Sequence, residues 1–279
     1  MNAKTLASIL LCPALLTLPA CDLGSGFEPN DDASRSEMRE AVVEVAELGD
    51  GLGAQDDVIE LTTSFTLGQG AQAAAEEIRD FVRSQVPCST VTLEPGLVSI
   101  DFGDLSDSCT YRGRTYAGVI TVQVELPGQG AHVVHTYEGF TGGRVTMDGQ
   151  SVVDWNGGER HIVTDLQFTS AERTVDVQSD RTQTFSLCED AEAVCVHIEG
   201  SREWTTPRGQ WQMTIDDVHA RSIDPVPEAG TYTVVNPEDR VIGLHFARLD
   251  EDTIRVEVTG GRRDLTFDVT AAGQVQDGE

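Results

Sequence analysis

From residue 88 to the end of the chain, apolar and polar residues alternate in short runs. In the first run, Val98, Ile100 and Phe102 alternate with polar residues, and later runs repeat the pattern at 120–126, 211–215, 242–246, 254–258 and 265–269. Alternation gives a strand one apolar and one polar face, as in an antiparallel sheet covered on one side. The pattern therefore predicts a mainly β fold. We expect a long antiparallel meander of roughly ten or more strands, forming a curled sheet or partial barrel because large twisted sheets curl.

Two segments before residue 88 have the period of an amphipathic helix instead. The first is predicted to begin at a serine cap, Ser34 or Ser36, and to end at Gly49. Residues 51–57 then read as a loop and residues 58–67 as a strand. These assignments follow the usual preference of glycine for helix ends and loops.

The second helix is predicted over residues 71–84, where Pro87 follows and prevents its continuation. Both helices have one apolar face, so both are expected to lie against the apolar face of the sheet. The proline-rich segment 225–227 is interpreted as a loop. Residues 35–279 are therefore predicted to form a single β-rich domain with N-terminal helices.

The start of the chain has the organisation of an exported protein. An apolar run over residues 6–18 has signal-peptide length and is too short for a permanent membrane helix. The run Leu18-Pro19-Ala20-Cys21 resembles the lipobox of bacterial lipoproteins, with proline as its one departure from the usual pattern. This resemblance implies cleavage before Cys21 and acylation of Cys21, which would anchor the protein to a membrane. The alternative is an ordinary secretory signal.

This interpretation assigns residues 1–20 to a signal peptide and residues 21–34 to the lipidated cysteine and a flexible tether. It places the protein in the bacterial cell envelope as a membrane-anchored lipoprotein, facing either the periplasm or the cell surface. The membrane is then a partner through the N-terminal lipid anchor.

The charge balance narrows the range of partners. The chain has 47 Asp and Glu against 19 Lys and Arg, for a formal net charge of −28. Nucleic-acid binding is disfavoured because phosphates would be repelled. Solubility explains the acidity most simply, and a cation-binding surface is the alternative.

Four cysteines follow Cys21, at positions 88, 109, 188 and 195. An even number in an exported protein predicts two disulfides, with three pairings open in principle. Proximity in sequence favours Cys88 with Cys109 and Cys188 with Cys195. A zinc site formed by the same thiols is a weaker alternative in an oxidising compartment.

The run Val98-Ser-Ile-Asp-Phe-Gly-Asp104, followed by Cys109 and the segment 112–122, resembles a group of β-rich bacterial lipoproteins of unknown function. The resemblance covers about residues 88–170. It implies a β meander and an envelope location, and it implies no activity.

The histidines suggest no catalytic or metal centre. His132 and His135 lie three residues apart in strand-like sequence, so their rings should point to opposite faces. His197 and His245 fall on polar faces, and surface or cross-strand positions are the expected role of all six histidines. The sequence also contains no G-x-S-x-G and no HExxH motif.

Three carboxylates recur with regular spacing at Asp101, Asp104 and Asp107. They lack the ligand spacing of an EF-hand, so a solvated turn is the favoured interpretation and weak divalent-cation binding the alternative. The three tryptophans are expected to pack in the core or brace hairpins, in preference to forming a binding platform.

These features predict a non-enzymatic binding or structural protein without a cofactor, whose partner is an unknown protein or small-molecule ligand. The first alternative is a carrier that encloses a lipid or other apolar ligand between sheet and helices. An extracytoplasmic hydrolase is the second alternative. A cavity between the helices and the sheet would favour the carrier, and a filled interface would oppose it.

Overall fold

The computed structural model describes residues 32–66, 68–107, 109–111, 113–128, 130–156, 158–186, 195–221 and 224–278, except for the side chain of Ser186. Asp32–Glu279 form one compact unit. The predicted signal peptide, Cys21 and most of the tether lie outside the described residues. No helix in the described part of the chain has the length and hydropathy of a membrane span.

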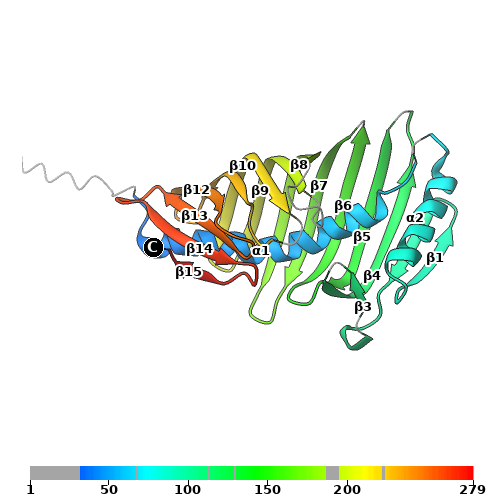
Figure 1. The fold of residues 1–279 in the computed structure, drawn as a ribbon, viewed down its shortest axis with the longest axis horizontal. Coiled ribbons are helices and arrows are strands. Elements are labelled where there is room, and N and C mark those ends of the chain that lie inside the picture. The colour runs from blue at the N-terminus through cyan, green and yellow to red at the C-terminus, as the bar shows by residue number, and fades with distance from the viewer. Residues whose placement is uncertain are drawn as a thin grey trace, which may run out of the picture. The chain divides into compact units, whose positions relative to one another are not determined.

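In the described residues, fifteen strands form one antiparallel sheet that does not close, which confirms the predicted open meander (Figure 1). Each strand pairs with the next along the chain, except that β2 pairs with β4 and β3 pairs with β4 alone. The strands are β1 (Thr90–Glu94), β2 (Leu97–Asp101), β3 (Cys109–Tyr111), β4 (Arg114–Glu125), β5 (Ala131–Thr141), β6 (Thr146–Asn156), β7 (Glu159–Thr169), β8 (Thr174–Ser186), β9 (Cys195–Thr206), β10 (Gly209–Arg221), β11 (Ala229–Val235), β12 (Val241–Arg248), β13 (Thr253–Thr259), β14 (Leu265–Thr270) and β15 (Val275–Asp277).

The long helix α1 (Arg35–Thr62) crosses the strands on one face of the sheet, which we call the inner face (Figure 1). It begins as predicted at Ser34, whose side chain accepts a hydrogen bond from the backbone nitrogen of Glu37 at 3.3 Å. The Glu37 carboxylate accepts one from the backbone nitrogen of Ser34 at 2.8 Å, which completes a capping box.

The helix does not end at Gly49, so the predictions of a loop over 51–57 and a strand over 58–67 are wrong. Close packing explains the glycine. A Cβ at Gly49 would lie 1.9 Å from the carbonyl oxygen of Pro225, so only glycine lets the helix approach this segment. More than half of the helix residues are buried. This burial outweighs a helix penalty of about 1 kcal/mol per glycine.

Replacing Gly49 with alanine is expected to lower the free energy of unfolding by about 1–3 kcal/mol, because the new methyl group would collide with backbone. In an ordinary helix the same change raises stability by about 0.5–1 kcal/mol. Urea denaturation of both proteins measures the difference. Gly51→Ala is the graded control, with a smaller loss, because its Cβ would meet the movable ring of Phe168 at 3.0 Å. A gain in stability from Gly49→Ala would contradict the close approach of Gly49 to Pro225.

Acidic residues of α1 hold the helix to the sheet through arginines. Such ion pairs along its length include Glu40–Arg208, Glu44–Arg173, Asp50–Arg114, Asp56–Arg181 and Glu60–Arg160. Because they come from different turns of α1 and from different strands or hairpin turns, they fix the position of the helix along the sheet. The acidic composition therefore has a structural use in addition to solubility.

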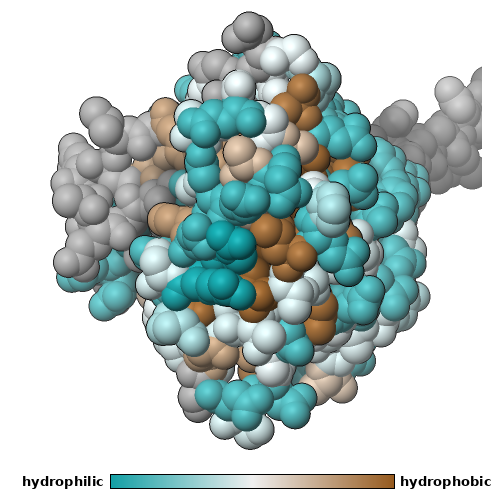
Figure 2. All heavy atoms as spheres, turned by 90° about the vertical axis from the view of Figure 1, so that its right-hand side faces the viewer, coloured by the Kyte–Doolittle hydropathy of each residue, from teal (hydrophilic) through white to brown (hydrophobic). Residues whose placement is uncertain are grey.

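The second helix, α2 (Ala71–Gln85), confirms the predicted helix over 71–84. It packs on β1, β2 and β4 at one end of the sheet, and its buried side chains include Ile78 and Val82. Figure 2 shows this end of the unit, where a narrow apolar band lies between polar side chains.

The alternation predicted for the strands is confirmed. In β7 every second residue is buried, from Arg160 to Phe168. The rings of Trp204 and Trp211 stack in the core with centroids 5.6 Å apart, and the Trp204 indole donates a hydrogen bond to Glu44 of α1 at 3.3 Å. These two tryptophans are therefore core residues, as expected.

Candidate functional site

A row of polar side chains crosses the inner face of the sheet. It occupies paired positions on five successive strands, β5 to β9: His135, Ser151, Thr164, Ser179 and Arg202. Gln55 of α1 donates hydrogen bonds to the hydroxyls of Ser151 at 2.5 Å and Thr164 at 2.9 Å. The row therefore joins the helix to the centre of the sheet, and it ends at Arg202.

His135, at the other end of this row, is wholly buried, so its assignment to the surface or to a cross-strand pair is wrong. Its Nε2 lies 2.7 Å from the Thr62 hydroxyl. Burial is the main cause that lowers the pKa of His135 to about 3; a hydrogen bond with the Ser151 backbone opposes this shift, and the charge of Arg160 adds to it. The histidine is therefore neutral at physiological pH.

This burial predicts acid sensitivity. Between pH 6.5 and pH 3 the unfolded chain binds a proton at His135 that the folded chain does not, so stability falls as pH falls through this window. At pH 5 the loss is about 2 kcal/mol relative to pH 7.5. Urea denaturation at both pH values, compared with His135→Gln, isolates this contribution. Equal pH dependence in the two proteins would contradict it.

At the Arg202 end of the row, a pocket lies between α1 and strands β7 to β11. Its cavity volume is about 70 Å³, and it is open to solvent. One face of α1 forms one wall, with residues spaced three or four apart: Gly49, Leu52, Gly53, Asp56 and Glu60. The segment Asp224 to Pro227, between β10 and β11, forms another side.

Four arginines line the pocket, one from each of the successive strands β7, β8, β9 and β10: Arg160, Arg181, Arg202 and Arg221. All four are buried. Buried guanidinium groups need counter-charges, because desolvation of an unpaired ion costs several kcal/mol. The partners of each arginine therefore determine what the pocket can bind.

Three of the four have carboxylate partners. Arg181 forms a bidentate pair with Asp56 of α1, with nitrogen–oxygen distances of 2.5 and 3.1 Å. Arg160 donates to Glu60 at 2.9 Å, and its guanidinium lies over the ring of Phe185, 4.3 Å from the centroid.

The third pair lies at the far side of the pocket. Arg221 donates to Asp224 through Nε at 2.9 Å and Nη2 at 3.3 Å. Arg248, from β12, also contacts Asp224. These pairs hold the segment Asp224 to Pro227 against the sheet.

Arg202 differs from the other three arginines in its partners. It is only 5% exposed, yet no described residue forms an ion pair or a side-chain hydrogen bond with it. Burial, with a smaller contribution from the charge of Arg181, lowers the pKa of Arg202 to about 10, so it stays charged at pH 7. The described lining thus holds four guanidinium groups against three carboxylates, and Arg202 carries the surplus positive charge.

A neutral donor and apolar groups complete the lining. Tyr232 is buried, which raises the pKa of its hydroxyl. The apolar side chains come from strands, helix and loop: Leu52, Phe185, Val196, Ile198, Ala220 and Val226. The pocket therefore offers a cation and a hydroxyl beside apolar surface.

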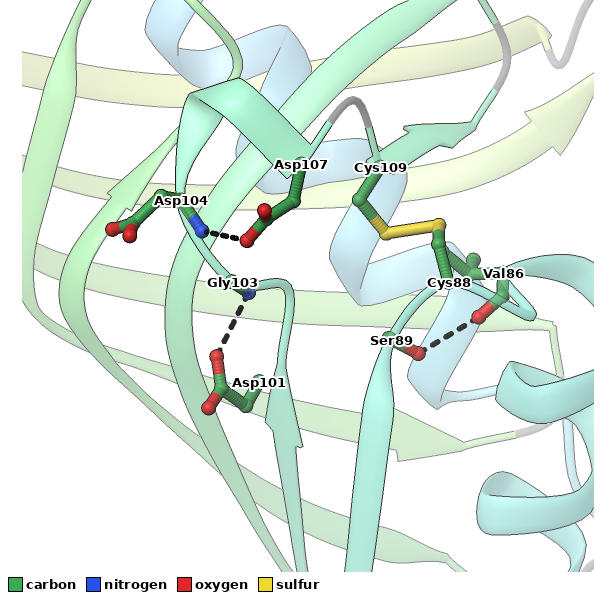
Figure 3. Close-up of a disulfide and its surroundings, with 8 residues drawn as sticks. All are labelled: Val86, Cys88, Ser89, Asp101, Gly103, Asp104, Asp107 and Cys109. Atoms are coloured by element: carbon green, nitrogen blue, oxygen red, sulfur yellow. Dashed lines mark hydrogen bonds between the residues drawn. A yellow bond between two sulfur atoms is a disulfide. The ribbon is translucent and has the colours of Figure 1, made fainter.

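None of the predicted cysteines and aspartates that the structure describes lines this pocket, although Cys195 pairs across the strands with the lining residue Arg221. Cys88 and Cys109 form a disulfide with Cα atoms 5.4 Å apart, which confirms the first predicted pair (Figure 3). It joins the segment after α2 to β3. Cys195 is buried at the start of β9, and Cys188 lies outside the described residues, so the second pair stays a prediction.

The three regularly spaced aspartates do not converge. Asp101 accepts a hydrogen bond from the backbone nitrogen of Gly103 at 2.8 Å, and Asp107 accepts one from the backbone nitrogen of Asp104 at 2.9 Å. Figure 3 shows the Asp104 carboxylate pointing away from Asp107. These contacts are those of a hydrogen-bonded turn, which was the favoured interpretation. The geometry of the three aspartates does not support cation binding there.

The other described histidines lie in cross-strand pairs, as expected. His132 contacts Asp154 at 2.7 Å, and His161 contacts Asp180 at 2.6 Å. His132 is half-exposed while His135 is buried, which confirms that the two rings point to opposite faces.

The pocket arginines were missed by sequence reasoning, although a signal was present. In β9, Arg202 is in phase with the core residues Ile198 and Trp204, so alternation alone places it on the inner face. Arg160 and Arg181 also occupy positions where the alternation of their strands predicts a buried residue. Charged residues at such positions are the sequence signal for this site.

Comparison of the chain with protein-family models, curated proteins and solved structures finds no match. The function is therefore inferred from the geometry of this pocket.

Proposed function

We propose that this protein is a membrane-tethered lipoprotein of the bacterial envelope that binds a small organic anion between α1 and the sheet, without catalysing a reaction. The observation that carries the proposal is Arg202, a buried guanidinium without a partner in the described structure. A bound anion would supply the missing counter-charge, so the desolvation cost of Arg202 favours binding.

The lining supports a monoanion with an apolar part, and a carboxylate fits best. A carboxylate can accept two parallel hydrogen bonds from one guanidinium, and the Tyr232 hydroxyl can donate a third. The apolar side chains that surround Arg202 would contact the hydrocarbon portion. The fixed carboxylates Asp56 and Glu60 oppose a ligand with several negative charges.

The other candidate functions have less support. A carrier for a long lipid needs an extended cavity, whereas buried side chains fill the α1–sheet interface on both sides of this pocket. A hydrolase needs a nucleophile and a base, and the described lining residues include no serine, cysteine or histidine, while the three lining carboxylates are each paired with an arginine. Binding is therefore the function that the pocket chemistry favours.

The tether is a separate part of the proposal and rests on the lipobox resemblance at residues 18–21. Cys21→Ser is expected to move the protein from the membrane fraction to the soluble fraction. Mass spectrometry of the wild-type protein should show acyl chains on Cys21. An unacylated N-terminus would contradict the tether and leave the pocket proposal intact.

Native mass spectrometry of the protein extracted from its own membrane tests the pocket. We expect one small adduct on the wild type and on Arg208→Met, which removes a guanidinium that contacts α1 outside the pocket. The adduct should be absent from Arg202→Met. No adduct on the wild type, or an adduct that Arg202→Met retains, would contradict the proposal.

A further inference from the structure

A second cluster lies on the outer face of the sheet, opposite α1. His197 of β9 and His219 of β10 occupy directly paired positions, and their ring centroids are 5.0 Å apart. Asp217 is two residues before His219. Among the described residues, these three form the one group of histidine, cysteine or acidic side chains close enough to share a metal ion.

A β-bulge brings the aspartate to the histidines. The register between β9 and β10 shifts between Ile215 and Val218, so Asp217 lies in the extra backbone of β10. Its φ is +49°, a left-handed conformation that aspartate tolerates better than most residues. Bulges commonly redirect a side chain, and here the carboxylate points to the paired rings.

The distances suit a tetrahedral metal ion. The Oδ1 atom of Asp217 lies 2.9 Å from Nε2 of His197 and 4.0 Å from Nε2 of His219. Zinc bonds of about 2.0–2.1 Å place neighbouring ligand atoms about 3.3 Å apart in a tetrahedron. The observed separations bracket this value, so small side-chain rotations would form the site.

We propose that His197, Asp217 and His219 bind a divalent transition-metal ion of the Zn²⁺ class, with water as the fourth ligand. Two imidazole nitrogens and one carboxylate oxygen are a ligand set that zinc accepts. All three side chains are at least partly exposed, so an ion can enter from solvent. The site is independent of the anion pocket, which lies on the inner face.

Two other histidine–aspartate pairs lack the third ligand. His161 with Asp180 and His132 with Asp154 have equally short contacts, but neither has another described histidine or acidic side chain close enough to complete a site. A two-ligand pair holds zinc weakly. His161→Ala is therefore the matched control for removal of an exposed histidine that contacts an aspartate.

Isothermal titration of Zn²⁺ into the purified protein, with excess Mg²⁺ to occupy weak carboxylate sites, tests the proposal. We expect one Zn²⁺ per chain, and an affinity at least about tenfold lower in His219→Ala and in Asp217→Asn. Asn also tolerates the left-handed backbone, so Asp217→Asn keeps the bulge. His161→Ala and Arg202→Met should bind zinc like the wild type.

Co²⁺ provides a second measurement, because tetrahedral Co²⁺ has intense visible absorption bands that octahedral surface-bound Co²⁺ lacks. These bands should appear with the wild type and disappear with His197→Ala. Absence of stoichiometric Zn²⁺ binding, or binding that survives both His197→Ala and His219→Ala, would overturn the proposal. Neither result would affect the anion pocket.

Discussion

Replacing Arg181 with methionine is expected to lower the free energy of unfolding by about 3–5 kcal/mol. Arg181 is buried beneath α1, and its bidentate contact with Asp56 joins the helix to β8. Without the guanidinium, the Asp56 carboxylate would keep one described side-chain hydrogen bond, a long one of 3.5 Å from the amide of Gln183, and a charge interaction with Arg202. Asp56 is about one-fifth exposed, so water would offset part of this cost and the lower end of the range is the better expectation.

Urea denaturation of wild type and Arg181→Met measures this change. Arg255→Met is the control, since Arg255 also pairs with an aspartate, Asp268, but Arg255 is substantially more exposed than Arg181. An exposed pair contributes about 0–1 kcal/mol. Equal losses in the two variants would show that burial does not determine the strength of the Arg181 pair.

Replacing Arg202 with methionine is expected to have the opposite effect. In the ligand-free protein, the change should raise the free energy of unfolding by about 1–4 kcal/mol, because it removes a buried charge and leaves no partner behind. The flexible methionine side chain can occupy the space of the Arg202 side chain, beside the apolar lining. The same change should abolish anion binding.

Denaturation of both proteins after removal of bound ligand by dialysis measures this gain. With ligand present the order should reverse, since only the wild type is stabilised by binding. A large loss of stability in ligand-free Arg202→Met would mean that Arg202 has a structural partner, and the proposed function would lose its main support. A lower free energy of unfolding in Arg181→Met and a higher one in ligand-free Arg202→Met would together distinguish a paired from an unpaired arginine.

Much of the fold could be predicted from local patterns. Alternation identifies strands such as β2 and β14 because only one face of this sheet is covered, so the apolar period survives in the sequence. The capping box at Ser34 and Glu37 is likewise local. Proximity is sufficient for Cys88 with Cys109 because a single short hairpin and turn separate them.

The length of α1 could not be predicted in this way. Gly49 has an intrinsic preference for ending a helix, and the contact that reverses this preference comes from Pro225, which is far away in the sequence. A helix propensity of about 1 kcal/mol is smaller than the free energy gained by burying a whole helix face, so tertiary packing determines where α1 ends.

The pocket was missed for a related reason. Arg160, Arg181, Arg202 and Arg221 are each ordinary when taken alone, and they become neighbours only when the registers of the three hairpins from β7 to β10 are known. The pairing of Arg160 and Arg181 with acidic residues depends on where α1 crosses the strands. The unpaired state of Arg202 is therefore a property of the assembled structure.

The position of α1 also has a consequence for how the chain folds. The sheet can grow one hairpin at a time, since nearly every strand pairs with its predecessor, and such local pairing is kinetically favourable. The helix is made before all the strands, yet it contacts β5 as well as β12, β13 and β14. It can dock fully only after the last of these strands is in place. We therefore expect the docking of α1, the helix that forms one wall of the pocket, to be completed late in folding.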